Sequence, residues 1–312
     1  MLTRRHIRVK VMQSLYAYNQ SQNDNLKVEE KFLLKSMEEM YDLFLLLLSL
    51  PVELKKLSEA YMEKSSLKFL PTQEDKDPNR KFLNNEAINL LDNNIYLNAA
   101  LEERKLNNWS KDDDYVQIVW KDLLSSDLYA EYMQTRNSSF IEDKEFLISI
   151  YKEIIAPNEK LYEYFEDRKL TWLDDLPLVN TAILKMFNKM KPDSQKQLTG
   201  LFKNHEDKEF AVDLFRKSLL KDRELFSEIE GKTPNWDQER IAEIDAVLLK
   251  MAICEFLYFP SIPVKVTINE YLEIAKEYST PKSSIFINGI LDKLSKQYQE
   301  ENKLNKMGRG LL

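Results

Sequence analysis

Glycine is scarce in this 312-residue chain, and that scarcity limits the possible folds more than any other feature. Only five glycines occur, and Gly308 and Gly310 lie at the end, which leaves Gly200, Gly231 and Gly289 for the body. Folds that bind nucleotides through a glycine-rich loop need several glycines close together, so that the backbone can approach phosphate. No dinucleotide-binding pattern, P-loop or G-x-S-x-G elbow is present. The sequence therefore argues against nucleotide-fold enzymes.

Residues for metal or thiol chemistry are also few. Cys254 is the single cysteine, and His6 and His205 are the two histidines, so the chain cannot form a Cys/His zinc cluster or an internal disulfide. We expect no catalytic residues, no metal and no cofactor. The lone thiol, a polar N-terminus without a signal-like segment, and an apolar run at 43–52 that is too short for a bilayer predict a cytoplasmic protein that does not enter a membrane.

Apolar residues recur at helical spacing along nearly the whole chain, which predicts an all-α fold. Residues 26–50 become apolar on all sides, as in a central buried helix, and we expect Pro51 to kink or restart it, with a third helix reaching about Ser65. The polar stretch 71–85 predicts a loop. The capping-box spacing of Thr267 and Glu270 suggests a helix start. Further helices are expected over 3–19, 86–106, 115–136 and 239–258, followed by two more around 268–275 and 286–294.

The second half of the chain contains an internal repeat. The string Asp143-Lys144-Glu145-Phe146 recurs as Asp207-Lys208-Glu209-Phe210, at an offset of 64 residues. Three further positions match at this offset: Tyr151 with Phe215, Leu161 with Leu225, and Trp172 with Trp236. Such a period predicts a duplicated helical unit. We accordingly expect an N-terminal helical segment (1–70), a linker with inserted helices (71–142), an inserted repeat (143–206) that resembles 207–255, a C-terminal helical domain (207–297) and a basic tail (298–312).

Positive charge is concentrated at the N-terminus of an otherwise acidic chain, whose formal net charge is −7. Arg4, Arg5, Arg8 and Lys10 precede the first acidic residue, Asp24. On a helix, the three arginines share one side, and a guanidinium suits phosphate because it donates two parallel hydrogen bonds. A solvated basic helix is the alternative explanation of the same pattern.

Two segments together resemble the NusB family of transcription antitermination factors. The opening RRHIRVKVMQSLY resembles the family's arginine-rich first helix, and the strings IPVKVTINE and FINGILD, in this order and spacing, resemble its second half. The resemblance covers about residues 1–50 and 207–297. It implies two NusB-like helical bundles, N-terminal and C-terminal, with an additional helical insertion that contains the repeat.

This resemblance also implies a function. Family members bind boxA-type single-stranded RNA jointly with NusE, a small-subunit ribosomal protein, and so modify the RNA polymerase elongation complex for read-through in ribosomal RNA operons. Carried over by motif, the RNA-binding residues would be Arg4, Arg5, Arg8, Gln13, Tyr16, Lys282 and Phe286. The NusE surface is expected on the C-terminal half, at Glu255, Tyr258, Glu270 and Glu273.

Two other functions compete with this one. A helical interaction scaffold that has lost RNA binding would have no need of the arginine cluster. A module associated with a ribosomal RNA methyltransferase would need a glycine-bearing cofactor domain, for which the body offers three scattered glycines. The sequence gives no role for residues 60–205 and does not fix the oligomeric state.

Overall fold

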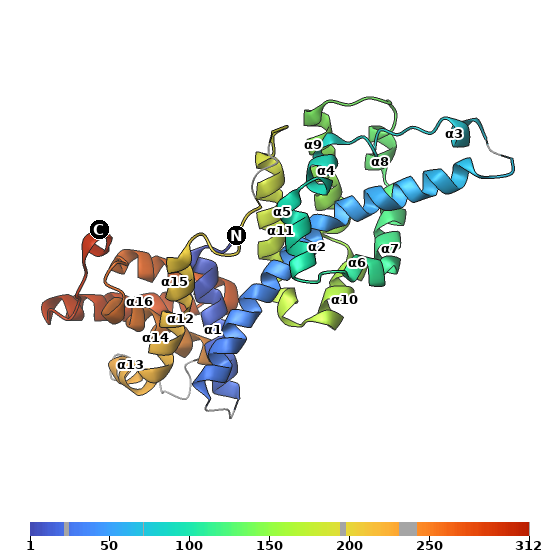
Figure 1. Ribbon diagram of the computed structural model, residues 1–312. Coiled ribbons are helices and arrows are strands. Elements are labelled where there is room, and N and C mark those ends of the chain that lie inside the picture. The colour runs from blue at the N-terminus through green and yellow to red at the C-terminus, as the bar shows by residue number, and fades with distance from the viewer. Residues whose placement is uncertain (22–24, 71, 194–197, 231–241, 312) are drawn as a thin grey trace. The chain divides into compact units, whose positions relative to one another are not determined.

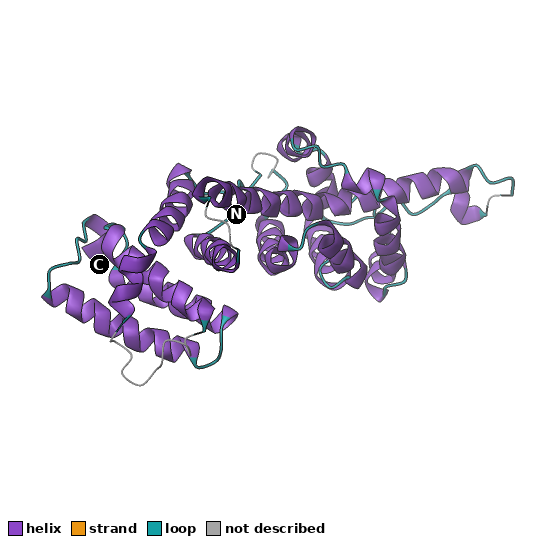
Figure 2. Cartoon of the chain, turned by 90° about the horizontal axis from the view of Figure 1, so that it is seen from below, coloured by secondary structure: helices purple, strands orange, loops and turns teal. Residues whose placement is uncertain are grey.

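The computed structural model describes residues 1–21, 25–70, 72–193, 198–230 and 242–311 (Figure 1). The chain divides into two compact units: unit 1 comprises residues 1–37 and 201–312, and unit 2 comprises residues 38–200. Within the described residues the backbone forms helices and connecting loops, without a strand (Figure 2). The all-α prediction is confirmed. The segment boundaries expected from the sequence are not tested by this division and stay predictions.

Unit 1 is built around the first helix, α1 (Arg4–Gln20), which begins where the sequence provides a cap. The Thr3 side chain accepts from the backbone N–H of His6, and His6 Nδ1 accepts from the Thr3 N–H, which satisfies donors that the first helical turn leaves unpaired. Apolar α1 residues such as Ile7 and Val11 are fully buried. The helix packs against α12, α14 and α15. The unit also contains the start of α2 (Leu26–Ser66), α12 (His205–Leu220), α13 (Asp222–Ile229), α14 (Glu243–Tyr258), α15 (Val264–Tyr278), α16 (Ser283–Glu300) and a short 3-10 turn (Gly308–Leu311).

Helix α2 is continuous through Pro51, where the sequence predicted a kink or a restart. Proline cannot donate to the carbonyl four residues earlier, so a proline inside a helix needs compensation nearby. The carbonyl that Pro51 cannot reach is that of Leu47, and the helix on both sides of it is held in the core, since Leu50 and Val52 are buried. Because this support comes from tertiary packing, the pattern around Pro51 alone did not reveal the continuity. The predicted burial of the helix is confirmed, since residues 43–48 are all at most 2% exposed.

Unit 2 surrounds its part of α2 with short helices. The predicted helices over 86–106 and 115–136 are each broken, because Asn94 and Ser126 cap new helices within them. The core is rich in aromatic pairs, among them Phe82 with Trp120 and the stacked rings of Tyr132 and Phe146. The helices are α3 (Gln73–Lys76), α4 (Glu86–Asp92), α5 (Ile95–Glu103), α6 (Asn108–Lys111), α7 (Asp113–Leu124), α8 (Asp127–Tyr132), α9 (Phe140–Ile150) with a π turn (Tyr151–Ile155), α10 (Glu159–Arg168) and α11 (Thr171–Lys189).

The internal repeat has a counterpart in the helices. The order α9, α10, α11 in unit 2 parallels α12, α13, α14 in unit 1. Matched positions are buried in both copies: Asp143 and Asp207, Phe146 and Phe210, Tyr151 and Phe215, and Leu161 and Leu225. Of the matched tryptophans, Trp172 is buried, and Trp236 lies outside the described residues. The repeat therefore aligns core positions.

Helix α15 begins earlier than the capping-box spacing suggested. Its first residue is Val264, preceded by Pro263 in an extended conformation. Thr267 is already inside the helix, and its hydroxyl donates to Glu255 Oε2 over 3.1 Å. The capping-box prediction was wrong because a distant buried carboxylate, which a local pattern does not show, occupies the Thr267 hydroxyl.

Candidate functional site

The three arginines of α1 each form an ion pair with a different helix of unit 1. Arg4 pairs with Asp207 on α12, Arg8 with Glu255 on α14, and Arg5 with Glu270 on α15. We call these six residues the arginine–carboxylate cluster. The partners lie between 203 and 265 positions away in the sequence. The cluster fixes α1 to the helices that it packs against.

The centre of the cluster is the pair between Arg8 and Glu255, whose side chains are 2% and 0% exposed. Arg8 donates from Nε to Oε1 over 2.5 Å and from Nη2 to Oε2 over 2.8 Å. Tyr271 adds a hydrogen bond to Oε1, so Thr267 and Tyr271 together satisfy the remaining acceptor capacity of this carboxylate. Burial alone would lower the pKa of Arg8, but the neighbouring charge and hydrogen bonds of Glu255 raise it. Arg8 is therefore held permanently charged, as part of the core.

Arg4 and Arg5 lie nearer the surface, with side chains 37% and 41% exposed. Arg5 donates from Nε and Nη2 to the two oxygens of Glu270, each over 2.9 Å. Arg4 donates from Nε to Asp207 over 3.1 Å, and its guanidinium lies 5.1 Å from the centre of the Phe210 ring. A guanidinium carries five N–H donors, so these contacts leave donors on both residues for a further acceptor. These two arginines are thus partly exposed, and each lies next to carboxylates, Arg4 beside Asp207 and Glu206 and Arg5 beside Glu270.

The other predicted RNA-binding residues are spread over α1 and α16. Tyr16 is exposed and Gln13 is half-buried, one turn apart on α1. Lys282 is exposed at the N-cap of α16, and Phe286 is half-buried in the first turns of that helix. No contact described in the structure joins these α16 residues to Arg4 or Arg5.

The four residues predicted for a partner surface differ in their exposure and in their partners. Glu255 is fully buried, because it is the acceptor for Arg8, and so it presents nothing to a partner in this structure. Glu270 is engaged by Arg5. Tyr258 is half-buried with its hydroxyl on Glu224, and Glu273 is exposed with an ion pair to Lys276. Residues assigned separately to RNA and to partner thus meet in one cluster.

Sequence reasoning missed several members of this region. Asp207 and Phe210 were noticed only as part of the repeat, Thr267 was assigned to a capping box, and Tyr271 was taken as a helix position. Their roles depend on pairings across the fold, and a single sequence carries no signal for those. The burial of Asp207, which explains its role, is visible only in the structure.

The C-terminal tail packs against the end of α14. Lys306 Nζ donates to the carbonyls of Glu255 and Phe259, each over 3.0 Å, and burial lowers its pKa to about 8. A cation at a helix C-terminus is favourable because the last carbonyls lack partners. Gly310 lies so close to Pro260 that a Cβ there would be 1.9 Å from the Pro260 carbonyl oxygen. Lys306 therefore serves as a cap on the helix that carries Glu255.

Among the described residues, no group of three His, Cys, Asp or Glu side chains is arranged to hold a metal ion. Within the same residues, none of the helices combines the length and the apolar character that crossing a membrane requires.

The fold and this cluster define a helical-bundle protein whose arginine-bearing first helix is anchored to its C-terminal helices. Residues 180–296, which run from within α11 into α16, match the model of the NusB family. Similar curated proteins are the transcription antitermination proteins NusB of Salinibacter ruber (45% identical, covering 34% of this chain and 66% of that protein), Chloroherpeton thalassium (41%, 34% and 50%) and Koribacter versatilis (41%, 31% and 67%). No solved structure matches the chain significantly.

The chain belongs to the NusB family. The matched part spans half to two thirds of the length of these relatives. The family match does not include α1, but the structure places α1 in the same unit as residues 201–296.

Acid is expected to weaken the contact between Arg5 and Glu270. The hydrogen bond from Arg5 lowers the pKa of Glu270 below its ordinary value of 4.5, against an opposing effect of burial. Because the folded-state pKa is the lower one, this carboxylate stabilises the fold above pH 4.5, and its contribution is lost as the pH falls through the folded value. We expect Glu270→Gln to lose less stability than the unmodified chain between neutral pH and about pH 3, measured by urea unfolding.

Glu277→Gln is the matched control on the same helix, because its side chain is exposed and an exposed charge contributes little to stability. The acid sensitivity of this control should stay close to that of the unmodified chain. Equal acid sensitivity of Glu270→Gln and the unmodified chain would contradict the prediction.

Proposed function

We propose that this protein is a transcription antitermination factor that binds boxA-type single-stranded RNA together with NusE and acts on the RNA polymerase elongation complex. In this proposal it is a binding protein of the cytoplasm and carries out no catalysis. Arg4 and Arg5 contact phosphate, Gln13 and Tyr16 lie beside them, and Lys282 and Phe286 form a second contact on α16. Arg8 is buried and contributes indirectly, by holding α1 in place.

One observation carries the proposal: the arginine helix is anchored, through three separate ion pairs, to α12, α14 and α15, all of which lie in the segment that matches the NusB family. The relatives with that segment are named as antitermination proteins. A rigidly held arginine pair favours phosphate binding, because less side-chain freedom is lost when the contact forms.

The ion pairs also change what can be inferred about function from the presence of the arginines. A scaffold without RNA binding was expected to have no use for them, but Arg8 has a structural use in the core. The presence of the arginines alone therefore does not distinguish the two functions, and a binding measurement is needed.

The test is fluorescence anisotropy with a labelled boxA-like RNA and a scrambled RNA of the same composition, each with and without purified NusE. We expect binding that prefers the boxA-like sequence and tightens when NusE is added. If the protein binds neither RNA, even with NusE present, the proposal fails and the scaffold function takes its place.

Lys282 offers a separate prediction about the α16 contact. The exposed lysine attracts phosphate, whereas a carboxylate at this position would repel it. We expect Lys282→Glu to weaken RNA binding and to make the loss larger at low salt than at high salt. Lys296→Glu, further along α16, is the control for a general charge effect. Unchanged RNA affinity in Lys282→Glu would remove this residue from the RNA surface.

A further inference from the structure

Unit 2 carries an exposed apolar tip directly after α2. Leu67, Phe69 and Leu70 are 84%, 97% and 82% exposed. We call these three residues the tip. Single exposed apolar residues are common on protein surfaces, but three large ones within four positions form a contiguous patch of the kind that marks an interaction site.

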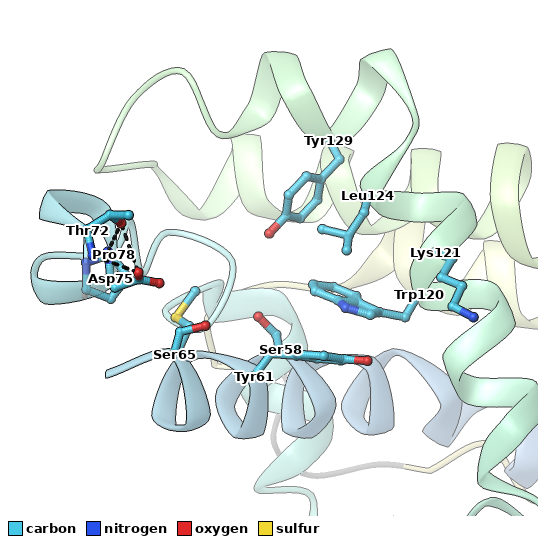
Figure 3. Close-up of a pocket in the computed structure, with 11 residues that line it drawn as sticks. Ser58, Tyr61, Ser65, Thr72, Asp75, Pro78, Trp120, Lys121, Leu124 and Tyr129 are labelled. Atoms are coloured by element: carbon cyan, nitrogen blue, oxygen red, sulfur yellow. Dashed lines mark hydrogen bonds between the residues drawn. The ribbon is translucent and has the colours of Figure 1, made fainter. Parts of the chain in front are cut away.

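A hollow of about 400 Å³ lies beside the tip; its lining is mainly apolar and also includes the charged residues Asp75 and Lys121. Ser58 and Tyr61 of α2 line one side (Figure 3). Met62 of the same helix also lines the hollow. Trp120 and Leu124 of α7 face them, together with Tyr129 of α8 (Figure 3). Tyr61 and Leu124 are nearly half exposed, so the mouth of the hollow is apolar as well. Ser65 and Thr72, which flank the tip in the sequence, also line the hollow, so the tip and the hollow are adjacent.

We propose that the tip of one chain inserts into this hollow on a second copy of the chain, and that the second copy returns the same contact. A protruding apolar group and an apolar hollow on one face make that face self-complementary, which a two-fold dimer requires. In such a dimer each tip is covered and each hollow is filled. The proposal concerns unit 2 alone and does not depend on the RNA-binding function of unit 1.

The area and charge of this face agree with a second copy as the occupant. An exposed phenylalanine offers on the order of 200 Å², so a tip of three large side chains offers on the order of 500 Å² per copy. Two tips, with the surfaces that they cover, then exceed the ~1,000 Å² that a specific interface needs. The lining of the hollow carries both signs of charge, Asp75 and Lys121, so two copies do not repel each other there.

Sedimentation velocity of the full chain over a range of micromolar concentrations tests the proposal. We expect a dimer whose dissociation constant rises at least about a hundredfold in Phe69→Asp, because each of two identical contacts contributes on the order of tenfold or more. Leu124→Asp, at the mouth of the hollow, should have a similar effect. Ile95→Asp is the matched control, since Ile95 is an exposed apolar residue of unit 2 that lies on α5 and does not line the hollow. Circular dichroism establishes that each variant is folded.

A crosslinking experiment shows which groups meet. Chains with Phe69→Cys and chains with Leu124→Cys, each with a different tag, are mixed and oxidised, and the natural Cys254 is buried and does not compete. A disulfide between the two differently tagged chains is the expected product. A monomer at all concentrations, a dimer that Phe69→Asp leaves intact, or disulfides that join only two chains carrying Phe69→Cys would each overturn the proposal.

Discussion

Replacing Arg8 by methionine is expected to lower the free energy of unfolding by about 3–5 kcal/mol, because it leaves the buried Glu255 carboxylate without its counter-ion. The methionine fills much of the same volume, so the loss reports the missing charge more than a cavity. Tyr271 and Thr267 still donate to Glu255, and their hydrogen bonds keep the loss from exceeding this range. Urea unfolding followed by circular dichroism measures the effect.

Arg5→Met is the matched control, since it removes a guanidinium from the same helix but from a pair whose arginine is 41% exposed. An exposed pair contributes at most about 1 kcal/mol. Trp109, Trp120 and Trp172 all lie in unit 2, and Trp236→Phe removes the remaining tryptophan. In that background tryptophan fluorescence reports on unit 2 alone, so it distinguishes a loss of stability in unit 2 from one in unit 1, where Arg8 lies. If Arg8→Met and Arg5→Met cost the same, Arg8 is not the structural anchor described above.

Removing both surface arginines is expected to weaken the binding of boxA-like RNA and its salt dependence together. Each phosphate contact on single-stranded RNA contributes about 0.7 to the slope of the logarithm of affinity against the logarithm of salt concentration, so Arg4→Ala with Arg5→Ala should make the slope shallower by about 1.4. Each lost charge-assisted hydrogen bond is worth about 1.5–3 kcal/mol, or roughly ten- to hundredfold in affinity. Anisotropy titrations at several salt concentrations measure both quantities.

Lys296→Ala serves as the control, because Lys296 is an exposed lysine of α16 with an intrahelical partner in Asp292. Its slope should match that of the unmodified chain. A double arginine variant that binds less tightly but keeps an unchanged slope would show that the arginines act through the fold and not through phosphate.

Glu270→Gln is a useful companion in the same titrations. It removes a negative charge from beside the proposed phosphate path, while the glutamine amide oxygen can still accept a hydrogen bond that positions Arg5, so it should tighten RNA binding. The opposite signs expected for the arginine and glutamate variants make a general loss of folding easy to recognise.

The sequence was sufficient for elements whose signals are local. The first helix was expected over 3–19 and occupies Arg4–Gln20, because its cap and its apolar stripe are both contained in its own residues. The end of α14 at Tyr258, two residues before Pro260, was equally predictable from the sequence. Helix α2 was divided in two because the burial that supports it on both sides of Pro51 depends on tertiary packing, which the local pattern around a proline does not show.

The candidate site shows the same limit more sharply. The arginines were identified as a group, but nothing near them in sequence indicated that Arg8 would be buried against Glu255. Glu255 and Glu270 were placed on a partner surface by the family resemblance, which says nothing about where the arginines of the first helix lie. The charged residues were thus recognised from the sequence, but their pairing was not. Which charges pair depends on which helices the fold brings together.

The separation between α1 and its partners has a consequence for how the chain is made. Residue 8 leaves the ribosome 247 positions before residue 255. At about 5–20 residues per second, Glu255 is therefore synthesised on the order of 12–50 s after Arg8, its partner in the first helix. During that interval unit 2 is completed, while the face of α1 with Ile7, Val11 and Leu15 has nothing from α12, α14 or α15 to cover it. Synthesis order therefore makes the N-terminal helix of the newborn chain a natural target for chaperones.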